Sequence, residues 1–339
     1  MMKYPGTNIR ICWAMLGLTI GACDVVETPS TAQASTEAQG TQMQGTQMQG
    51  TELQGMSMQG MQFAGATLAG DPLVHVRVER GELVAERGQV TLRGTALVGA
   101  QLHAQVQNVS VTPPVAATAN YRITAIAPEL AKYDPTGTGN TYLYTLEQWV
   151  GSTGSWQPAC AADPDGRRVA IPMTAIWNQH GDRVESSSLF TFACTTGVIA
   201  KCYRWGYRPW VTGYGDLTAM HWTCTRVARA DYCGVGVAHT RNGTMINLWD
   251  RLPAPGPIQR HGLTPLLMFF EAGWNTGGAV CLSHSRWLLD DVQLLVAVCP
   301  DRLVLPGLGQ AICDTVTDVL GLDPHALLYN EAYLNLIGP

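Results

Sequence analysis

The chain has 339 residues, of which 46% are hydrophobic and 14% are charged. This balance can bury a sizeable core and excludes a wholly disordered chain, and the length suits two domains or one domain with appendages. The formal net charge of −5 excludes capture of bulk nucleic acid, which needs a basic surface. We therefore expect no nucleic-acid partner, and we expect no cofactor.

The first residues predict an export signal that ends in a lipid anchor. Lys3 and Arg10 precede an apolar run, residues 11–22, that is too short to cross the ~30 Å core of a membrane. The run ends in glycine and alanine directly before Cys23, which resembles a bacterial lipobox. We predict a signal peptide over 1–22 and lipidation of the Cys23 thiol. Ordinary secretory cleavage before an incidental cysteine is the alternative.

The anchor predicts a cell-envelope location. Acyl chains on Cys23 would hold the protein to a membrane, and the small polar residues 23–40 would form a tether. The outer membrane is favoured, and Asp24 leaves the inner membrane as an alternative. No other uninterrupted apolar run reaches ~18 residues, so no transmembrane helix is expected.

Residues 41–106 repeat with a period of five and enclose a predicted hairpin at 71–89. The units resemble the pentapeptide-repeat pattern, whose coils stack with the central apolar residue pointing inward. A flexible Gln/Gly-rich stalk is the alternative for the first units, while 61–70 and 90–104 are expected to be ordered. In the hairpin, valines alternate with polar residues before the turn Arg80-Gly81. The unit centres are Met43, Met48, Leu53, Met58, Phe63, Leu68, Leu92, Leu97 and Leu102.

Residues 107–339 have the composition of a globular domain. Because strand and helix signals do not alternate cleanly, the sequence favours an α+β fold over a doubly wound parallel sheet. In the clearest helix, 217–232, Cys224 falls on the buried stripe. We expect strands at 121–126, 141–150, 169–177, 189–193, 244–249 and 266–272, and helices at 197–205, 217–232 and 310–320.

The cysteines predict a disulfide framework. Once Cys12 leaves with the signal and Cys23 is lipidated, an even number remains, all of it between residues 160 and 313, which indicates four disulfides of unknown pairing. A zinc site built from His221, Cys224, Cys281 and His284 is the weaker alternative, because the other cysteines would still need partners. The remaining cysteines are Cys160, Cys194, Cys202, Cys224, Cys233, Cys281, Cys299 and Cys313.

One segment carries a family resemblance. Residues 230–233 read Ala-Asp-Tyr-Cys, between an aromatic and arginine-rich stretch at 200–210 and the run 239–244. This pattern resembles the ADYC domain family of bacterial lipoprotein-like proteins, whose domain often follows Gln/Gly-rich pentapeptide stretches. The similarity covers about residues 121–335. It implies domain limits and an envelope location, and it implies no reaction.

Candidate catalytic residues come from separate segments. No GxSxG, HExxH or P-loop signature is present. An extracellular hydrolase would use His239 with Asp231 or Glu271, and Asp250 is a further acid. The alternative is that Asp231 pairs with neighbouring arginines and that the motif has a purely structural role.

We therefore expect a non-enzymatic envelope lipoprotein that binds a surface protein or a glycan. The unusual features of the sequence, which are the lipobox, the repeats and the cysteines, serve anchoring, spacing and cross-linking. The hydrolase remains the alternative. The sequence favours an aromatic-rich core over a carbohydrate-stacking platform for four aromatic residues, Trp205, Tyr207, Trp210 and Trp222.

Overall fold

The fold is taken from a computed structural model. It describes residues 61–108, 115–129, 141–178, 180–186, 189–240, 244, 246–252, 259–260, 268–286, 295, 297–299 and 313–333. The predicted signal peptide, Cys23, the tether and the repeat units before residue 61 lie outside these residues. Over the described ranges, no helix is long and apolar enough to cross a membrane.

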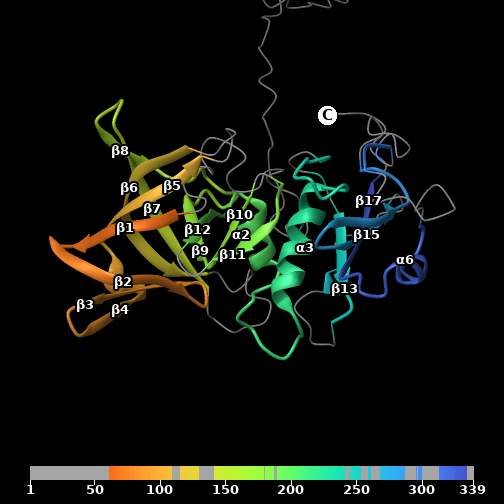
Figure 1. The fold of residues 1–339 in the computed structure, drawn as a ribbon, viewed down its shortest axis with the longest axis horizontal. Coiled ribbons are helices and arrows are strands. Elements are labelled where there is room, and N and C mark those ends of the chain that lie inside the picture. Colours follow the sequence, from red (N-terminus) through yellow and green to blue (C-terminus); the bar gives the residue numbers. More distant parts are fainter. Residues whose placement is uncertain are drawn as a thin grey trace, which may run out of the picture. The chain divides into compact units, whose positions relative to one another are not determined.

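The first half of the described chain forms one antiparallel sheet (Figure 1). A 3-10 helix at Gly94–Leu97 connects two of its strands. The strands are β1 (Met61–Leu68), β2 (Asp71–Glu79), β3 (Glu82–Arg87), β4 (Val90–Arg93), β5 (Gln101–Asn108), β6 (Val115–Pro128), β7 (Tyr142–Val150), β8 (Ser155–Pro158), β9 (Val169–Met173) and β12 (Leu189–Cys194).

This sheet closes on itself through β1. Its order runs β12-β9-β7-β6-β5-β1, and β1 also pairs with β12 at Met61↔Phe190. Strands β2, β3 and β4 extend the sheet from β1, and β8 extends it from β7. The predicted boundary between 106 and 107 falls inside this sheet, because β5 and β6 are paired along their length.

Side chains fill the inside of the closed ring. Successive residues of a strand point to opposite faces. On β6, Tyr121 and Ile123 are therefore buried, while Arg122 between them is half-exposed. Leu83 of β3 is also buried, and its backbone N–H donates to the Tyr144 hydroxyl at 2.9 Å. The hairpin of β2 and β3 is thus attached to the ring core.

The hairpin turn is held against the second half of the chain. Arg80 and Gly81 both have positive φ, 50° and 75°, as two-residue hairpin turns with a right-handed strand twist require. A Cβ at Gly81 would lie 2.4 Å from the Trp210 ring, so only glycine leaves room for that ring. Trp210 therefore fixes the position of the turn.

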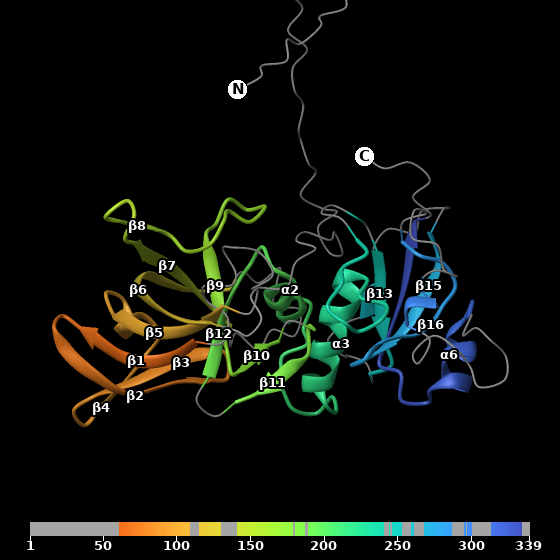
Figure 2. The same ribbon diagram turned by 45° about the horizontal axis from the view of Figure 1, so that its top comes forward.

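The second half combines helices with a five-stranded antiparallel sheet of order β14-β13-β17-β15-β16 (Figure 2). Helix α3 contacts α2 and strands β15, β16 and β17, while α6 contacts β15 and β16. The elements are β10 (Ala175–Trp177), β11 (Arg183–Glu185), α2 (Val198–Arg204), α3 (Leu217–Arg229), β13 (Ile246–Asp250), β14 (Gln259–Arg260), β15 (Met268–Asn275), β16 (Gly278–Leu282), α6 (Val316–Leu322) and β17 (Leu328–Tyr333).

Helix α3 has clear local signals at both ends. The Asp216 carboxylate accepts hydrogen bonds from the backbone N–H groups of Thr218 and Ala219, which caps the helix N-terminus. The helix ends at Arg229, and Ala230 adopts the left-handed conformation with φ 50°. Cys224 is fully buried, as its place on the apolar stripe predicts.

The α+β expectation is wrong. Within the described residues, strands of antiparallel sheets make up 46% and helices only 17%, and α2, α3 and α6 are the α-helices whose bounds are defined. Strands such as β8, β10, β11 and β14 have only two to four residues. A strand this short has too few residues to display alternation, so sequence reasoning undercounted strands.

All eight C-terminal cysteines are paired, which confirms the predicted framework. The bridges are Cys160–Cys194, Cys202–Cys224, Cys233–Cys299 and Cys281–Cys313. The first joins the β8–β9 connection to β12, and the second joins α2 to α3. The Cys233–Cys299 bridge attaches the segment after β16 to the turn after α3. The Cys281–Cys313 bridge attaches that segment to β16 itself.

Candidate functional site

The segment 230–233 forms a buried junction at the end of α3. The Asp231 carboxylate accepts hydrogen bonds from Arg226 Nη1 at 2.5 Å and from the backbone N–H groups of Val235 and Gly236 at 3.1 and 3.0 Å. Arg226 also forms an ion pair with Asp182 at 2.5 Å. These bonds fix the turn after α3 and attach it to the loop before β11.

Tyr232 connects this turn to the second sheet. Its hydroxyl donates to Glu271 Oε1 at 3.1 Å and accepts from the backbone N–H of Arg286 at 2.8 Å. Arg286 binds both oxygens of Glu271, at 3.0 and 2.9 Å, and both side chains are 0% exposed. Asn330 of β17 donates to Glu271 Oε2 at 2.8 Å. Burial is the largest cause that raises the pKa of Tyr232 well above its ordinary value, so its hydroxyl stays protonated.

The backbone approaches very closely at this junction. Gly278 has φ +117°, and a Cβ there would lie 2.6 Å from the Tyr232 carbonyl oxygen. The Ala279 N–H donates to that same carbonyl at 2.9 Å. Cys233 then continues into its disulfide with Cys299. The junction is therefore tied to β16 by backbone contact and to the C-terminal segment by a covalent bond.

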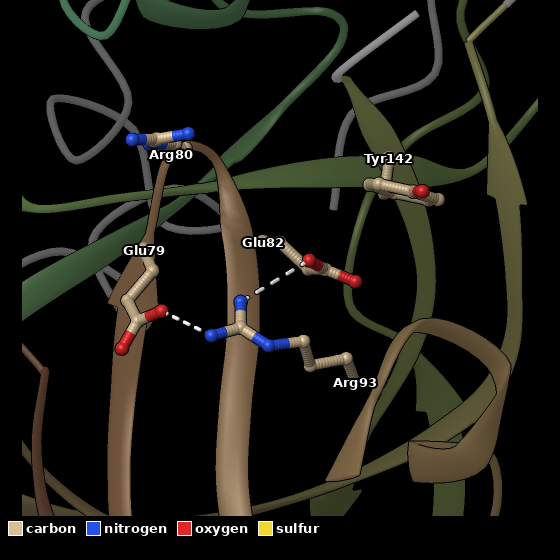
Figure 3. A pocket seen from close by; sticks show the side chains of 5 residues that line it. All are labelled: Glu79, Arg80, Glu82, Arg93 and Tyr142. Atoms are coloured by element: carbon tan, nitrogen blue, oxygen red, sulfur yellow. Dashed lines mark hydrogen bonds and ion pairs between the residues drawn. The ribbon is translucent and has the colours of Figure 1, made fainter. Parts of the chain in front are cut away.

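A polar pocket of about 440 Å³ lies at the turn of the β2–β3 hairpin, which we call the charged hairpin (Figure 3). It is lined by Glu79 and Arg80 at the end of β2 and its turn, Glu82 of β3, Arg93 of β4, and Tyr142 of β7. The sequence did not indicate this pocket, because the five positions come together only when β2, β3, β4 and β7 meet.

Arg93 organises the charges of the pocket. Its guanidinium lies between two carboxylates, hydrogen-bonded to Glu79 and 3.5 Å from Glu82 Oε2 (Figure 3). Hydrogen bonds from Arg93 and then Arg77 hold the pKa of Glu79 below its ordinary value. The Glu79 carboxylate is therefore charged at neutral pH. The Arg80 side chain is exposed, and the lining carries two acids and two arginines.

The sequence matches the ADYC domain family over residues 94–288, more than half of the chain. The chain belongs to the ADYC domain family. No curated protein and no solved structure matches it.

The ADYC match is shorter than the folded unit. It begins at Gly94, after β4, and ends before α6 and β17. Strand β1, which closes the ring, and β17, which lies between β13 and β15, are therefore both outside it. The family expected from the motif is confirmed, and each sheet is completed by strands outside the matched segment.

The candidate hydrolase residues lie in different bonding environments. The Asp231 and Glu271 carboxylates are buried and bound to Arg226 and Arg286, and each Glu271 oxygen accepts two hydrogen bonds. The backbone N–H of His239 donates to the Arg229 carbonyl, and its ring lies 5.5 Å from the Tyr232 ring. Two of the candidate acids thus stabilise the ADYC junction.

Asp250 lies in a third environment. Its Oδ2 accepts a hydrogen bond from the Tyr207 hydroxyl at 3.0 Å, and its Oδ1 accepts one from the Leu252 N–H at 2.9 Å. The carboxylate therefore holds the end of β13 against the loop after α2.

The alternative zinc ligands are engaged elsewhere. Cys224 and Cys281 are both in disulfides, and neither bridge involves the other. His221 Nε2 lies 3.0 Å from the Ile199 carbonyl, and the His284 ring nitrogens contact the carbonyls of Ser285 and Phe269. Among the residues that the structure describes, no group of three or more His, Cys, Asp or Glu side chains could hold a metal ion.

His221 gives a pH-dependent prediction. It is fully buried against Tyr203 and Trp177, and burial lowers its pKa to about 3, below the ordinary 6.5. Below about pH 6.5 the histidine is protonated in the unfolded chain, whereas in the native state it stays neutral until the pH approaches 3. The free energy of unfolding therefore falls as the pH drops from 6.5 towards 3. The expected slope is up to about 1.4 kcal/mol per pH unit.

Urea unfolding at pH 7 and pH 4 tests this effect. His221→Phe keeps a ring at the site and should reduce the loss of unfolding free energy between the two pH values. The same replacement at the exposed His325 is the control. An identical pH dependence in wild type and His221→Phe would contradict the assignment.

Three of the four aromatic residues singled out in the sequence lie in or against the core. Trp205 and Tyr207 are buried, at 5% and 0% exposure, and Trp210 lies against the Tyr203 ring at 5.0 Å. They belong to the core, as favoured from sequence. Trp149, which is 40% exposed, and its partner Trp156 lie at the β7–β8 hairpin, and sequence analysis did not single them out. The sequence does carry a signal for this pair, because Trp149 and Trp156 lie equally far before and after the turn Gly151–Gly154 and so face each other across it.

Proposed function

We propose that this ADYC protein is a lipid-anchored, non-enzymatic binding module of the cell envelope, and that its charged hairpin pocket binds a glycan. The observation that carries the proposal is the lining of the pocket by carboxylates, guanidinium groups and a tyrosine. No serine, cysteine or histidine nucleophile lines it. The main candidate acids outside it are occupied by buried arginines.

The chemistry of the pocket suits hydroxyl groups. Carboxylates accept hydrogen bonds, guanidinium groups donate them, and the Tyr142 ring offers an apolar surface beside its own hydroxyl. Because the acids and arginines of the lining balance, the pocket favours a ligand without a large net charge. The ion pairs of Arg93 hold Glu79 and Glu82 in place before a ligand arrives, which reduces the entropy cost of binding.

The anchor part of the proposal has its own test. Expression in a bacterium that processes lipoproteins should give a mature chain that begins at Cys23, with the mass of the diacylglyceryl and acyl groups. Intact mass spectrometry of the detergent-extracted protein measures this directly. Cys23→Ser should release the protein from the membrane fraction. An unacylated chain that needs no detergent would contradict the anchor.

The pocket is tested by calorimetric titration of peptidoglycan fragments and soluble envelope polysaccharides. Glu82→Gln removes a charged acceptor and should weaken binding by about tenfold to a hundredfold, since such hydrogen bonds contribute ~1.5–3 kcal/mol. Arg87→Gln is the matched control, because Arg87 is an exposed charged residue of β3 outside the pocket. Equal binding by wild type and Glu82→Gln would reject the pocket as the site.

A turnover screen tests the non-enzymatic part. The purified protein is incubated with peptidoglycan, polysaccharide, peptide and ester substrates, and no turnover above background is expected. Turnover that disappears in His239→Ala, with an unchanged unfolding curve, would overturn this part of the proposal and favour the hydrolase.

A further inference from the structure

The β7–β8 hairpin (Figures 1 and 2) carries a pair of tryptophans, Trp149 and Trp156. Trp149 and Trp156 are directly opposite each other in the register of the two strands. Their ring centroids are 5.6 Å apart with an interplanar angle of 66°, an edge-to-face contact. Trp149 nevertheless remains 40% exposed. A rigid, supported indole is thus presented to solvent.

Arg122 of β6 fixes the second ring of the pair. Its guanidinium carbon lies 4.8 Å from the Trp156 ring centroid, and its Nε donates to the Glu147 carboxylate. Arg122 and Glu147 are register partners on adjacent strands, and both are partly exposed. The three side chains of this stack therefore hold one another in place, while the Arg–Glu pair leaves no net charge.

Polar side chains extend the same face across the sheet. His103 of β5 and Asn120 of β6 are opposite each other in register, and His103 Nδ1 lies 2.6 Å from Asn120 Oδ1. Both residues are exposed, whereas Leu102 and Tyr121, the next register pair along the same two strands, are buried in the ring core. Residues His103, Asn120, Arg122, Glu147, Trp149 and Trp156 are defined here as the outer face.

We infer that the outer face is a second glycan-binding site, which takes a stretch of polysaccharide chain across β5, β6, β7 and β8. The inference rests on the proposed function and adds a site separate from the pocket. Sugar rings have an apolar C–H face that stacks on an indole, and hydroxyl groups that pair with amide, imidazole and ion-paired side chains. The outer face offers both kinds of group on one side of the sheet.

Other occupants fit this surface less well. A polyanion would need uncompensated positive charge, but Arg122 is neutralised by Glu147. A membrane would need a continuous apolar patch, but polar side chains flank the tryptophans. A cross-strand aromatic pair stabilises a hairpin by ~0.2–1 kcal/mol, and this stabilisation is enough to explain why the two rings contact each other. It does not account for the exposure of Trp149.

Calorimetry and tryptophan fluorescence on the full-length protein test the inference. The probes are soluble β-glucan, mannan, xylan and peptidoglycan strands. At least one probe should bind the wild type, Trp149→Ala should weaken its binding at least tenfold, and Trp149→Phe should restore most of the loss. Phe269→Ala removes an aromatic side chain of β15 that is 47% exposed, slightly more than Trp149, and should bind as the wild type does. Bound polymer should also protect the wild type from acrylamide quenching more than it protects Trp149→Phe.

The outcomes separate the outer face from the pocket. If Trp149→Ala binds polymer like the wild type while Glu82→Gln does not, the outer face is rejected and the proposed function stands. If no probe binds the wild type, glycan binding at both sites is rejected. If Trp149→Ala loses a protein partner while polymer binding is unchanged, the outer face is a protein interface. Thermal unfolding of each variant excludes a loss of fold.

Discussion

A chain shortened to the matched segment, residues 94–288, is expected to show no cooperative unfolding transition. It would lack β1, and with β1 the pairing with both β5 and β12 that closes the ring. It would also lack β17, whose two edges pair with β13 and β15. Two disulfides would lose a partner, since Cys299 and Cys313 lie beyond residue 288. Both sheets would expose unpaired strand edges and core side chains.

Urea titration followed by circular dichroism and tryptophan fluorescence measures this outcome. A chain of residues 61–339, which retains every described strand, is the control and should unfold in a single sigmoidal transition. A sharp transition and native-like near-ultraviolet signal in the 94–288 chain would mean that the matched segment is an independent domain.

Arg286→Met is expected to lower the free energy of unfolding by about 3–5 kcal/mol. Glu271 and Arg286 bind each other through two hydrogen bonds in an environment without solvent exposure. Methionine fills similar volume but leaves the buried Glu271 carboxylate without its cation, which is the costly situation for a broken buried ion pair. Denaturant unfolding at pH 7 gives the value.

Two further variants identify the cause of this loss. Glu271→Gln combined with Arg286→Met removes the unpaired buried acid and should recover part of the stability. The amide oxygen can accept from Asn330, and the amide nitrogen can donate to the Tyr232 hydroxyl, which occupy these positions in the wild type. Arg87→Met removes a solvent-exposed ion pair to Asp71 at 3.7 Å and should cost less than ~1 kcal/mol. If Arg286→Met is no more destabilising than Arg87→Met, the buried pair does not stabilise the fold.

The sequence predicted the elements with long, regular patterns. The alternation in 141–150 corresponds to β7, and the helical spacing in 217–232 corresponds to α3, with Cys224 buried as expected. The even cysteine count predicted complete pairing, but it could not select partners. Pairing depends on which segments meet in space: Cys233 and Cys299 are separated by 66 positions.

The rest of the fold depends on contacts that the local sequence does not encode. Strand β17 reads as a short mixed run, and it becomes a central strand only because β13 and β15 lie on either side of it. In the same way, Glu79 and Tyr142 share a pocket because the hairpin folds back against β7. Asp231 and Glu271 were candidate acids by residue type, but their partners Arg226 and Arg286 determine their role.

The closure of the ring has a consequence for the order of folding. Met61 pairs with Phe190, 129 positions later in the chain. During synthesis or refolding, β1 can pair early with β5, but its other edge must wait until β12 is available. Contacts between such distant residues carry a large loop-closure cost and form slowly. We therefore expect ring closure to be a late kinetic step, during which the free edges of β1 and β12 are open to pairing with another chain.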